Sequence, residues 1–251
     1  MRPRSLLHAV HLAVKELSLP TPGTSTWRGC AGVRNVVMAD GGPSPCGDSR
    51  RAPVVLVHGF GATVAVWARL RQRLYAEGFS HVVMAGYSAA RTDLATVCAG
   101  VAALCQAVGS AFASSGIHLV GHSLGGLVAR SVAQSLGASV RVDTLMTIAT
   151  PHRGSHAARL TGGGCARAMR PGSPWLAALD EQCLQDQTWW VNYYSELDLV
   201  VRRSSGRAAG RALNVVVGGR GHQGIASSPF LVGHLVGQLT ASEARGHLVV
   251  A

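Results

Sequence analysis

A short apolar run that leads into a serine between glycines is the feature that most restricts how this chain can fold. Residues 117–126 read IHLVGHSLGG and contain the pattern G-x-S-x-G around Ser123. The apolar run indicates a buried strand, and the residues after the serine have helical spacing, so Ser123 falls on a sharp strand-to-helix turn. Gly121 and Gly125 leave room for the backbone to fold back there without Cβ clashes. The Ser123 hydroxyl is therefore expected to project above a sheet, next to the positive end of a helix.

Strands and helices alternate along the rest of the chain. Short apolar or β-branched runs predict strands at residues 53–57, 81–85, 117–120, 144–149, 189–194 and 213–217. Apolar residues at helical spacing predict helices at 62–77, 93–112, 125–136 and 228–239. Near-continuous apolar strands separated by helices predict an α/β fold, with a mainly parallel central sheet and helices on both faces.

The composition divides the chain at residue 53. Residues 1–52 form an N-terminal extension, whose start predicts a peripheral amphipathic helix or a poorly ordered tail and whose remainder is rich in Gly, Pro and Ser. Residues 53–251 are expected to form one domain, with an irregular segment at about 151–187 inserted over the edge of the sheet. Charged and polar residues interrupt the apolar start of the chain, so a secretory leader is not expected and a cytoplasmic location is favoured over secretion.

An uncharged stretch from Leu94 to Ala129 is long enough to cross a membrane. Glycine and serine residues interrupt it, much of it is alanine, and its later part reads as a strand. We therefore interpret the stretch as part of a buried core.

The net charge of +11 raises the question of an anionic partner. Lys15 is the single lysine among 23 basic residues, and such a preference for arginine indicates a genome rich in G and C. No helix carries a dense arginine stripe and no nucleic-acid-binding motif occurs, so we expect no nucleic-acid partner. Peripheral contact with lipid surfaces is left open, because positive charge favours approach to anionic head groups.

The cysteines at positions 30, 46, 98, 105, 165 and 183 contain no C-x-x-C pair, which argues against zinc-ribbon and thioredoxin-type sites. Cys98 and Cys105 lie in an apolar stretch and are expected to behave as small hydrophobic residues. Cys165 and Cys183 could close a loop by a disulfide in an exported protein, and six free thiols are the alternative. No carboxylate-rich loop or histidine pair occurs, so neither a metal nor a cofactor is expected.

Three motifs in a fixed order carry a resemblance to a known superfamily. They are VVLVHGFGAT at 54–63, GHSLGG at 121–126 and TIATPHRGS at 147–155. Over roughly residues 53–240 they resemble the α/β-hydrolase lipases and esterases, particularly the actinobacterial triacylglycerol-lipase-like group. The resemblance implies the α/β-hydrolase fold with a cap or lid insertion, a serine nucleophile, and a small-molecule acyl ester or lipid as the substrate.

A serine hydroxyl is a weak nucleophile at pH 7 and needs a neighbouring base. The resemblance implies the chain order serine, acid, histidine for the residues that activate it. His222 follows the predicted strand 213–217 across a glycine-rich turn, which is where the family carries its base. His152 lies in the family's T-P-H-x-G turn and is the second candidate.

The acid is expected at the end of the predicted strand 189–194, where the family places the carboxylate that orients the histidine. Asp198 lies there, 24 residues before His222. Glu196 is two residues away and competes for the same role, and an exposed loop carboxylate is the structural alternative for Asp198.

Two further groups of residues follow from the resemblance. His58 to Gly61 matches the family's oxyanion loop, which implies that the backbone N–H groups of Phe60 and Leu124 stabilise the oxyanion. The imidazole of His58 is expected to have a structural role. The insertion also contains four apolar residues: Met169, Trp175, Leu176 and Leu179. They are expected either to face the acyl chain of the substrate or to cover the edge of the sheet.

The sequence thus predicts a serine hydrolase that cleaves carboxylic esters through an acyl-enzyme. Thioester hydrolysis or acyl transfer with the same residues is the first alternative. A catalytically idle scaffold that binds lipid or a partner through 151–187 is the second. The presence of serine, aspartate and histidine in the family order argues against the idle scaffold.

Overall fold

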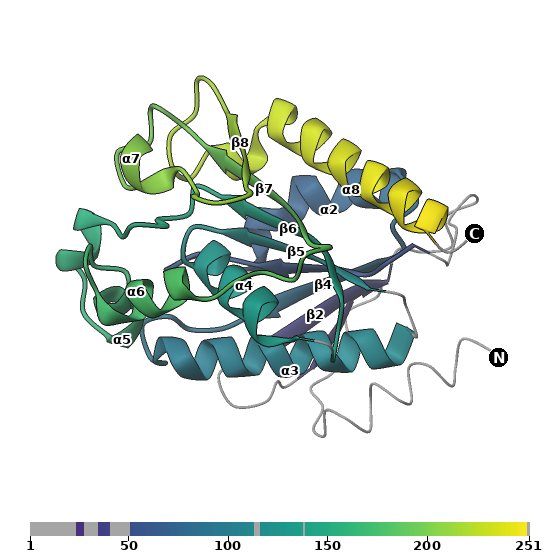
Figure 1. The fold of residues 1–251 in the computed structure, drawn as a ribbon, viewed down its shortest axis with the longest axis horizontal. Coiled ribbons are helices and arrows are strands. Elements are labelled where there is room, and N and C mark those ends of the chain that lie inside the picture. Colours follow the sequence, from purple (N-terminus) through teal and green to yellow (C-terminus); the bar gives the residue numbers. More distant parts are fainter. Residues whose placement is uncertain (1–23, 28–34, 41–50, 113–115, 138, 250–251) are drawn as a thin grey trace.

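The computed structural model describes residues 24–27, 35–40, 51–112, 116–137 and 139–249, and the statements below concern that part of the chain. Its centre is an eight-stranded sheet with the order β1-β2-β4-β3-β5-β6-β7-β8 (Figure 1). The strands are β1 (Thr24–Trp27), β2 (Asn35–Asp40), β3 (Val54–Val57), β4 (His81–Gly86), β5 (Ile117–His122), β6 (Val142–Ile148), β7 (Trp189–Tyr194) and β8 (Leu213–Val216). The predicted N-terminal helix, Cys30 and Cys46 lie outside the described residues.

Six of the strands, β3 to β8, run parallel to one another. The other two come from the N-terminal extension, where β2 pairs antiparallel with β4 and β1 pairs antiparallel with β2. This pairing places β1 and β2 at one edge of the sheet. The predicted fold class, a mainly parallel sheet with helices on both faces, is therefore confirmed.

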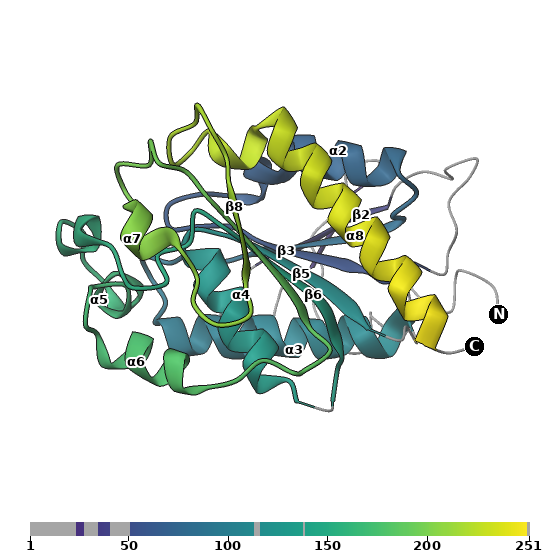
Figure 2. The same cartoon turned by 45° about the horizontal axis from the view of Figure 1, so that its top comes forward.

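The helices cover the two faces of the sheet (Figures 1 and 2). They are α2 (Ala68–Ala76), α3 (Leu94–Phe112), α4 (Leu124–Ser135), α5 (Gly164–Ala168), α6 (Pro174–Glu181), α7 (Arg203–Gly206) and α8 (Pro229–Val249), with the 3-10 turns η1 (Val64–Trp67), η2 (His156–Arg159) and η3 (Ile225–Ser227). Val55 and Val57 of β3 point to the core formed with α3 and α4. Val54 and Leu56 point to the core formed with α2 and α8. This alternation explains why the whole strand is apolar.

Helix α3 is long and apolar enough to cross a membrane by length and composition alone. One side of it is buried in the core: Leu94, Val97, Val101, Leu104, Cys105 and Val108. Because this stripe packs against the sheet and α4, the helix contributes to the core as the sequence predicts.

The segment 151–187 is not irregular, as the sequence had suggested, but contains η2, α5 and α6. It packs on the side of α3 and α4, where Ala158 and Cys165 are buried. The thiol of Cys165 donates a hydrogen bond to the backbone oxygen of Thr92 at 3.2 Å. Cys165 and Cys183 are both free thiols, so the disulfide alternative is wrong for this structure.

Helix α8 continues to Val249, ten residues beyond the predicted end at 239. Leu239 is the last buried apolar residue among the α8 side chains that the structure describes, which end at Ala244. Beyond it, Glu243 accepts hydrogen bonds from His118 Nε2 at 2.9 Å and from the Ala52 backbone N–H at 2.8 Å. Polar contacts hold this part of the helix, and the apolar periodicity therefore gives no sign of it.

Candidate active site

Ser123 lies on the turn between β5 and α4, with φ +56° and ψ −122°. A positive φ is rare for a residue with a side chain and costs conformational energy, so the surrounding structure must hold it in place. The Ser123 N–H donates to the Ile148 oxygen of β6 at 2.8 Å, and the Gly126 N–H donates to the Ser123 oxygen at 3.0 Å. These bonds fix the strained turn that the sequence predicts.

The two glycines beside the serine are required by packing. A Cβ on Gly121 would collide with the backbone of Gly125, and a Cβ on Gly125 would collide with the carbonyl oxygen of Val57. Both contacts are with backbone atoms that cannot move aside. The turn can therefore form only with glycine at both positions.

Three side chains form a continuous chain of hydrogen bonds at the carboxyl ends of the strands. The Ser123 hydroxyl donates to His222 Nε2 at 2.9 Å, and His222 Nδ1–H donates to Asp198 Oδ2 at 2.7 Å. A carboxylate can only accept, so the proton lies on Nδ1 and leaves Nε2 free to accept from the serine. Ser123, Asp198 and His222 are the nucleophile, acid and base that the sequence predicts, and the structure brings their side chains into contact.

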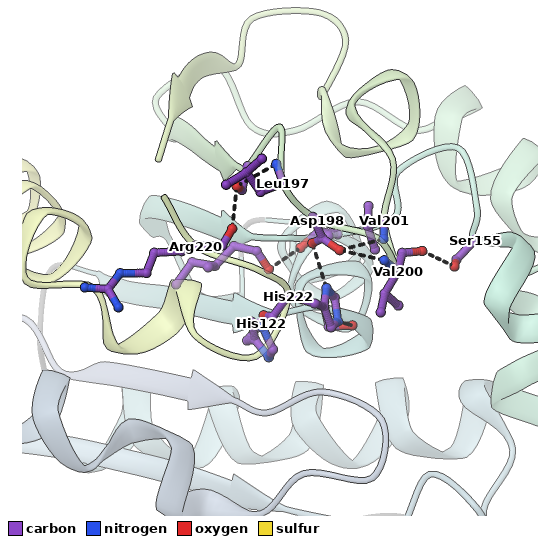
Figure 3. A network of polar contacts seen from close by, with 12 residues as sticks. His122, Ser155, Leu197, Asp198, Val200, Val201, Arg220 and His222 are labelled. Atoms are coloured by element: carbon purple, nitrogen blue, oxygen red, sulfur yellow. Dashed lines mark hydrogen bonds and ion pairs between the residues drawn. The ribbon is translucent and has the colours of Figure 1, made fainter. Parts of the chain in front are cut away.

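The carboxylate of Asp198 is buried and held by backbone groups as well as by the histidine (Figure 3). Its Oδ1 accepts from the N–H groups of Val200 at 2.9 Å and Val201 at 2.8 Å. Burial acts to raise the pKa of Asp198, but the hydrogen bonds from His222, Val201 and Val200 outweigh it and leave the pKa below its usual value. Asp198 therefore faces His222 as an anion.

The competing candidates for acid and base lie elsewhere. Glu196 forms an ion pair with Arg203 at 2.9 Å, and its side chain is 53% exposed. His152 contacts Asn192 Oδ1 through Nε2 at 3.1 Å, and burial together with the charge of Arg130 lowers its pKa to about 3. Neither residue takes part in the hydrogen-bond chain that includes Ser123.

His122 has a role that the sequence did not assign. Its Nε2–H donates to the backbone oxygen of His222 at 3.0 Å. Burial and the nearby charge of His222 lower the pKa of His122 to about 4, so its ring is neutral at pH 7. The ring thereby fixes the backbone of the residue that contacts Ser123. Its position next to the serine in the chain was the available signal.

A second unpredicted contact joins the loops that carry the acid and the base. The Ser195 hydroxyl donates to the Arg220 backbone oxygen at 2.5 Å, and it accepts from the Leu197 N–H at 3.1 Å. Since Ser195 is three residues from Asp198 and Arg220 is two from His222, this bond sets the spacing of the two loops.

The predicted oxyanion loop lies against the serine. A Cβ on Gly59 would lie 2.9 Å from Ser123 Cβ, so the backbone before Phe60 passes directly beside the nucleophile. His58 packs its ring on Tyr87 with centroids 4.4 Å apart, and its Nδ1 donates to the Gly59 oxygen at 2.9 Å. Leu124 is the first residue of α4, where backbone N–H groups have no partner within the helix.

The predicted acyl-binding set lies mainly inside the core. Met169, Leu176 and Leu179 are buried in the cluster formed with α3 and α4, and Trp175 is partly buried against it. Helix α6 is fixed there by Arg130, which donates to the Leu179 oxygen at 3.2 Å. Within the described ranges, no group of three or more His, Cys, Asp or Glu side chains is arranged to hold a metal ion.

Comparison with known proteins gives two kinds of match in sequence. A family model described as palmitoyl protein thioesterase matches residues 53–201. A triacylglycerol lipase of Burkholderia plantarii is 33% identical over 136 residues, which cover 50% of this chain and 37% of the lipase. The matching part thus spans little more than a third of that curated relative.

Solved structures show the same fold. A Bacillus licheniformis lipase in its mature form has a TM-score of 0.69 at 17% identity, over 79% of this chain and 96% of that one. A truncated carbohydrate esterase from gut microbiota has a TM-score of 0.68 at 15% identity, over 90% and 100% of the two chains. The fold is therefore that of the α/β hydrolases, as the sequence resemblance implied.

Proposed function

Because this chain belongs to the palmitoyl protein thioesterase family, we propose that it is a serine hydrolase that cleaves acyl esters with Ser123 as the nucleophile. The observation that carries the proposal is the hydrogen-bond chain from Ser123 through His222 to Asp198. The hydrogen-bond chain begins at Ser123, whose φ is positive, and strained backbone of this kind gathers at functional sites.

The reaction begins when His222 Nε2 takes the proton of the Ser123 hydroxyl and the serine oxygen attacks the acyl carbonyl carbon. Asp198 keeps the proton on Nδ1 and stabilises the imidazolium that forms. The negative charge on the carbonyl oxygen is held by the N–H groups of Phe60 and Leu124, and one such donor contributes about 10²–10³ in rate.

The tetrahedral intermediate collapses when its bond to the leaving oxygen breaks. The imidazolium returns its proton from Nε2 to that oxygen, so the alcohol leaves and the acyl group stays on Ser123 as an ester. A water molecule then gives a proton to His222 Nε2 and attacks the acyl carbonyl. The bond from the acyl carbon to Ser123 Oγ breaks, and the imidazolium returns its proton to that oxygen, which releases the acid and restores the hydroxyl. Each step uses His222 alternately as base and acid.

The acyl group is proposed to be lipid-like, in keeping with the printed names of the relatives, a palmitoyl protein thioesterase family and a triacylglycerol lipase. In the insertion, Trp175 is the member of the predicted set with exposed surface and would contact the acyl chain first. Met169, Leu176 and Leu179 are buried, and they would reach the substrate only if α5 and α6 moved.

Thioester hydrolysis is the second candidate function, and the family model favours it because it describes palmitoyl thioesterases. The same Ser123, His222 and Asp198 would serve, with a thiol in place of the alcohol as the leaving group. Parallel assays with palmitoyl esters and palmitoyl thioesters of small alcohols and thiols, compared by kcat/KM, separate the two functions.

The test of the proposal is the Ser123→Ala variant with a p-nitrophenyl ester and a fluorophosphonate probe. The wild-type protein is expected to release p-nitrophenol and to be labelled at Ser123, and the variant to lose labelling and nearly all turnover. Because the alanine removes a single oxygen, unfolding midpoints of the two proteins should agree. Wild-type turnover in a folded Ser123→Ala protein would refute the assignment.

A further inference from the structure

A pocket lined by arginines lies beside α7 and takes no part in the proposed reaction. Its volume is about 640 Å³, within the range of small-molecule binding sites. The residues that line it are Arg153, Arg202, Arg203, Ser204, Arg207 and Ala208. We refer to these residues as the arginine pocket.

The positive charge of the arginine pocket is largely uncompensated. Glu196 pairs with Arg203 at 2.9 Å, but no ion pair joins Arg153, Arg202 or Arg207 to a carboxylate among the described residues. The segments that form the pocket are themselves free of acidic residues, since none occurs from 144 to 179 or from 199 to 242. Codon preference can raise the number of arginines, but it does not gather them around one pocket.

Hydrogen bonds fix the walls of the arginine pocket to each other and to the sheet. Arg153 donates to the Ser205 oxygen through its backbone N–H at 3.4 Å and to the Ser204 oxygen through Nη1 at 3.3 Å. Asn192 of β7 donates to the Gly206 oxygen through Nδ2 at 2.8 Å. The backbones that carry the guanidinium groups are thus held in place before any ligand binds.

The arginine pocket directly adjoins the loop of the proposed acid. Arg202 follows Val201, whose N–H holds Asp198, and the Ser155 hydroxyl donates to the Val200 oxygen at 2.5 Å. Helix α7 lies at the same end of the molecule as α5 and α6 (Figures 1 and 2). The pocket therefore lies next to the loop that holds Asp198, which is the position that a substituent of the substrate outside the reacting bond would need to reach.

We propose that the arginine pocket binds a phosphate group of the acyl substrate, an inference that rests on the proposed function. The guanidinium group is planar, remains charged, and donates two parallel hydrogen bonds to phosphate oxygens. The phosphate could be carried by a soluble thiol carrier or by a lipid head group. Either source presents the same chemistry to the pocket, and the assay substrates below distinguish them.

The first test measures binding without turnover. The Ser123→Ala protein is titrated with inorganic pyrophosphate by calorimetry at low salt, and compared with a protein that also carries R202Q and R207Q. The two arginines were chosen because neither forms an ion pair with another residue that the structure describes. We expect about a tenfold weaker association in the pocket variant. The matched control, R69Q with R71Q on α2, removes the same charge and should bind as the parent does. Equal binding by pocket and control variants would refute the proposal.

The second test compares substrates in the catalytically competent protein. Palmitoyl-coenzyme A is paired with a neutral palmitoyl thioester, and phosphatidic acid with diacylglycerol in neutral detergent micelles. In R202Q/R207Q, the ratio of kcat/KM for the phosphate-bearing substrate to that for its neutral partner should fall about tenfold. A lower kcat/KM ratio for the two palmitoyl thioesters identifies a soluble carrier as the source of the phosphate. A lower ratio for phosphatidic acid and diacylglycerol identifies a lipid head group.

Unchanged ratios in both pairs would refute a role for the arginine pocket in substrate recognition. If the wild-type protein cleaved none of the substrates, the proposed function would fail. The pyrophosphate titration would still decide whether the pocket binds phosphate, so the two failures are distinguishable.

Discussion

At the scale of single residues, Gly121 and Gly125 show how closely the turn around Ser123 is packed. We expect Gly121→Ala to destabilise the protein by about 1–3 kcal/mol or more, because its Cβ meets backbone atoms of the α4 start. Gly237→Ala is the control, since a Cβ there meets nothing within 4 Å on the exposed side of α8. That change should stabilise the protein by about 0.5–1 kcal/mol. Denaturant unfolding measures both, and destabilisation of equal size by the two changes would contradict this account.

Asp198 and Glu196 are both candidates for the acid, and their hydrogen bonds and ion pairs distinguish them. Asp198→Asn should lower kcat for a neutral ester about 10⁴-fold, because the amide would hold His222 in the wrong tautomer. Glu196→Gln should change kcat less than about twofold, since its partner is the exposed Arg203. Steady-state kinetics with a p-nitrophenyl ester give both values. A large loss in Glu196→Gln with a small one in Asp198→Asn would reverse the assignment.

The sequence predicts the positions of Ser123 and His222 because a serine turn and a glycine-rich turn each follow a recognisable strand, and because the resemblance implies the base at the second turn. It favours Asp198 as the acid but leaves Glu196, two residues away on the same loop, as a competitor. The difference arises from the backbone amides of Val200 and Val201, which turn Asp198 inward. Such amide contacts depend on the path of a loop, and side-chain types do not encode that path in a simple pattern.

At the scale of elements, apolar patterning located the core strands and helices but missed the last part of α8. Buried apolar residues define an element by their spacing, and among the α8 side chains described, up to Ala244, this spacing stops at Leu239. The rest of α8 depends on Glu243, which contacts residues far away in the chain, His118 and Ala52. Contacts between single polar residues leave no periodic signal, so sequence periodicity underestimates the helix.

Glu243 also predicts how the stability of α8 depends on pH. Burial acts to raise the pKa of Glu243, but hydrogen bonds from His118 and Ala52 outweigh it and leave the pKa below its usual value. The folded protein therefore binds this proton less readily than the unfolded chain does. The contribution of Glu243 to stability is present above the unfolded pKa of about 4.3 and is lost as the pH falls through the lower folded value.

We accordingly expect Glu243→Gln to lower the free energy of unfolding by about 1 kcal/mol at pH 7. The difference from the wild-type protein should shrink below about pH 4. Urea unfolding from pH 7 down to pH 3 measures it. Glu181→Gln, at the exposed end of α6, is the control and should change the free energy by less than about 0.5 kcal/mol at every pH. A difference for Glu243→Gln that grows toward acid pH would contradict the inferred direction.

At the scale of the whole molecule, the N-terminal extension is joined to the hydrolase domain through backbone pairing. β2 pairs with β4 from Asn35 to Asp40, and β1 completes that edge. The composition places a domain boundary at residue 53, and we retain it as a proposal about where the compact unit begins. The pairing implies that the edge of this unit is covered by residues that precede the boundary.

Removal of residues 1–50 therefore tests how far the unit depends on the extension, while Arg51 and Ala52 keep their contacts with α8. The deletion turns β4 into an edge strand with unpaired backbone groups, which favour pairing with another molecule. We expect the unfolding midpoint to fall by roughly 5 °C or more. Light scattering should show association that rises with concentration. If the truncated protein kept the wild-type unfolding midpoint and stayed monodisperse, the compact unit would be complete without β1 and β2. Such a result would contradict the stabilising role that the pairing of β2 with β4 implies.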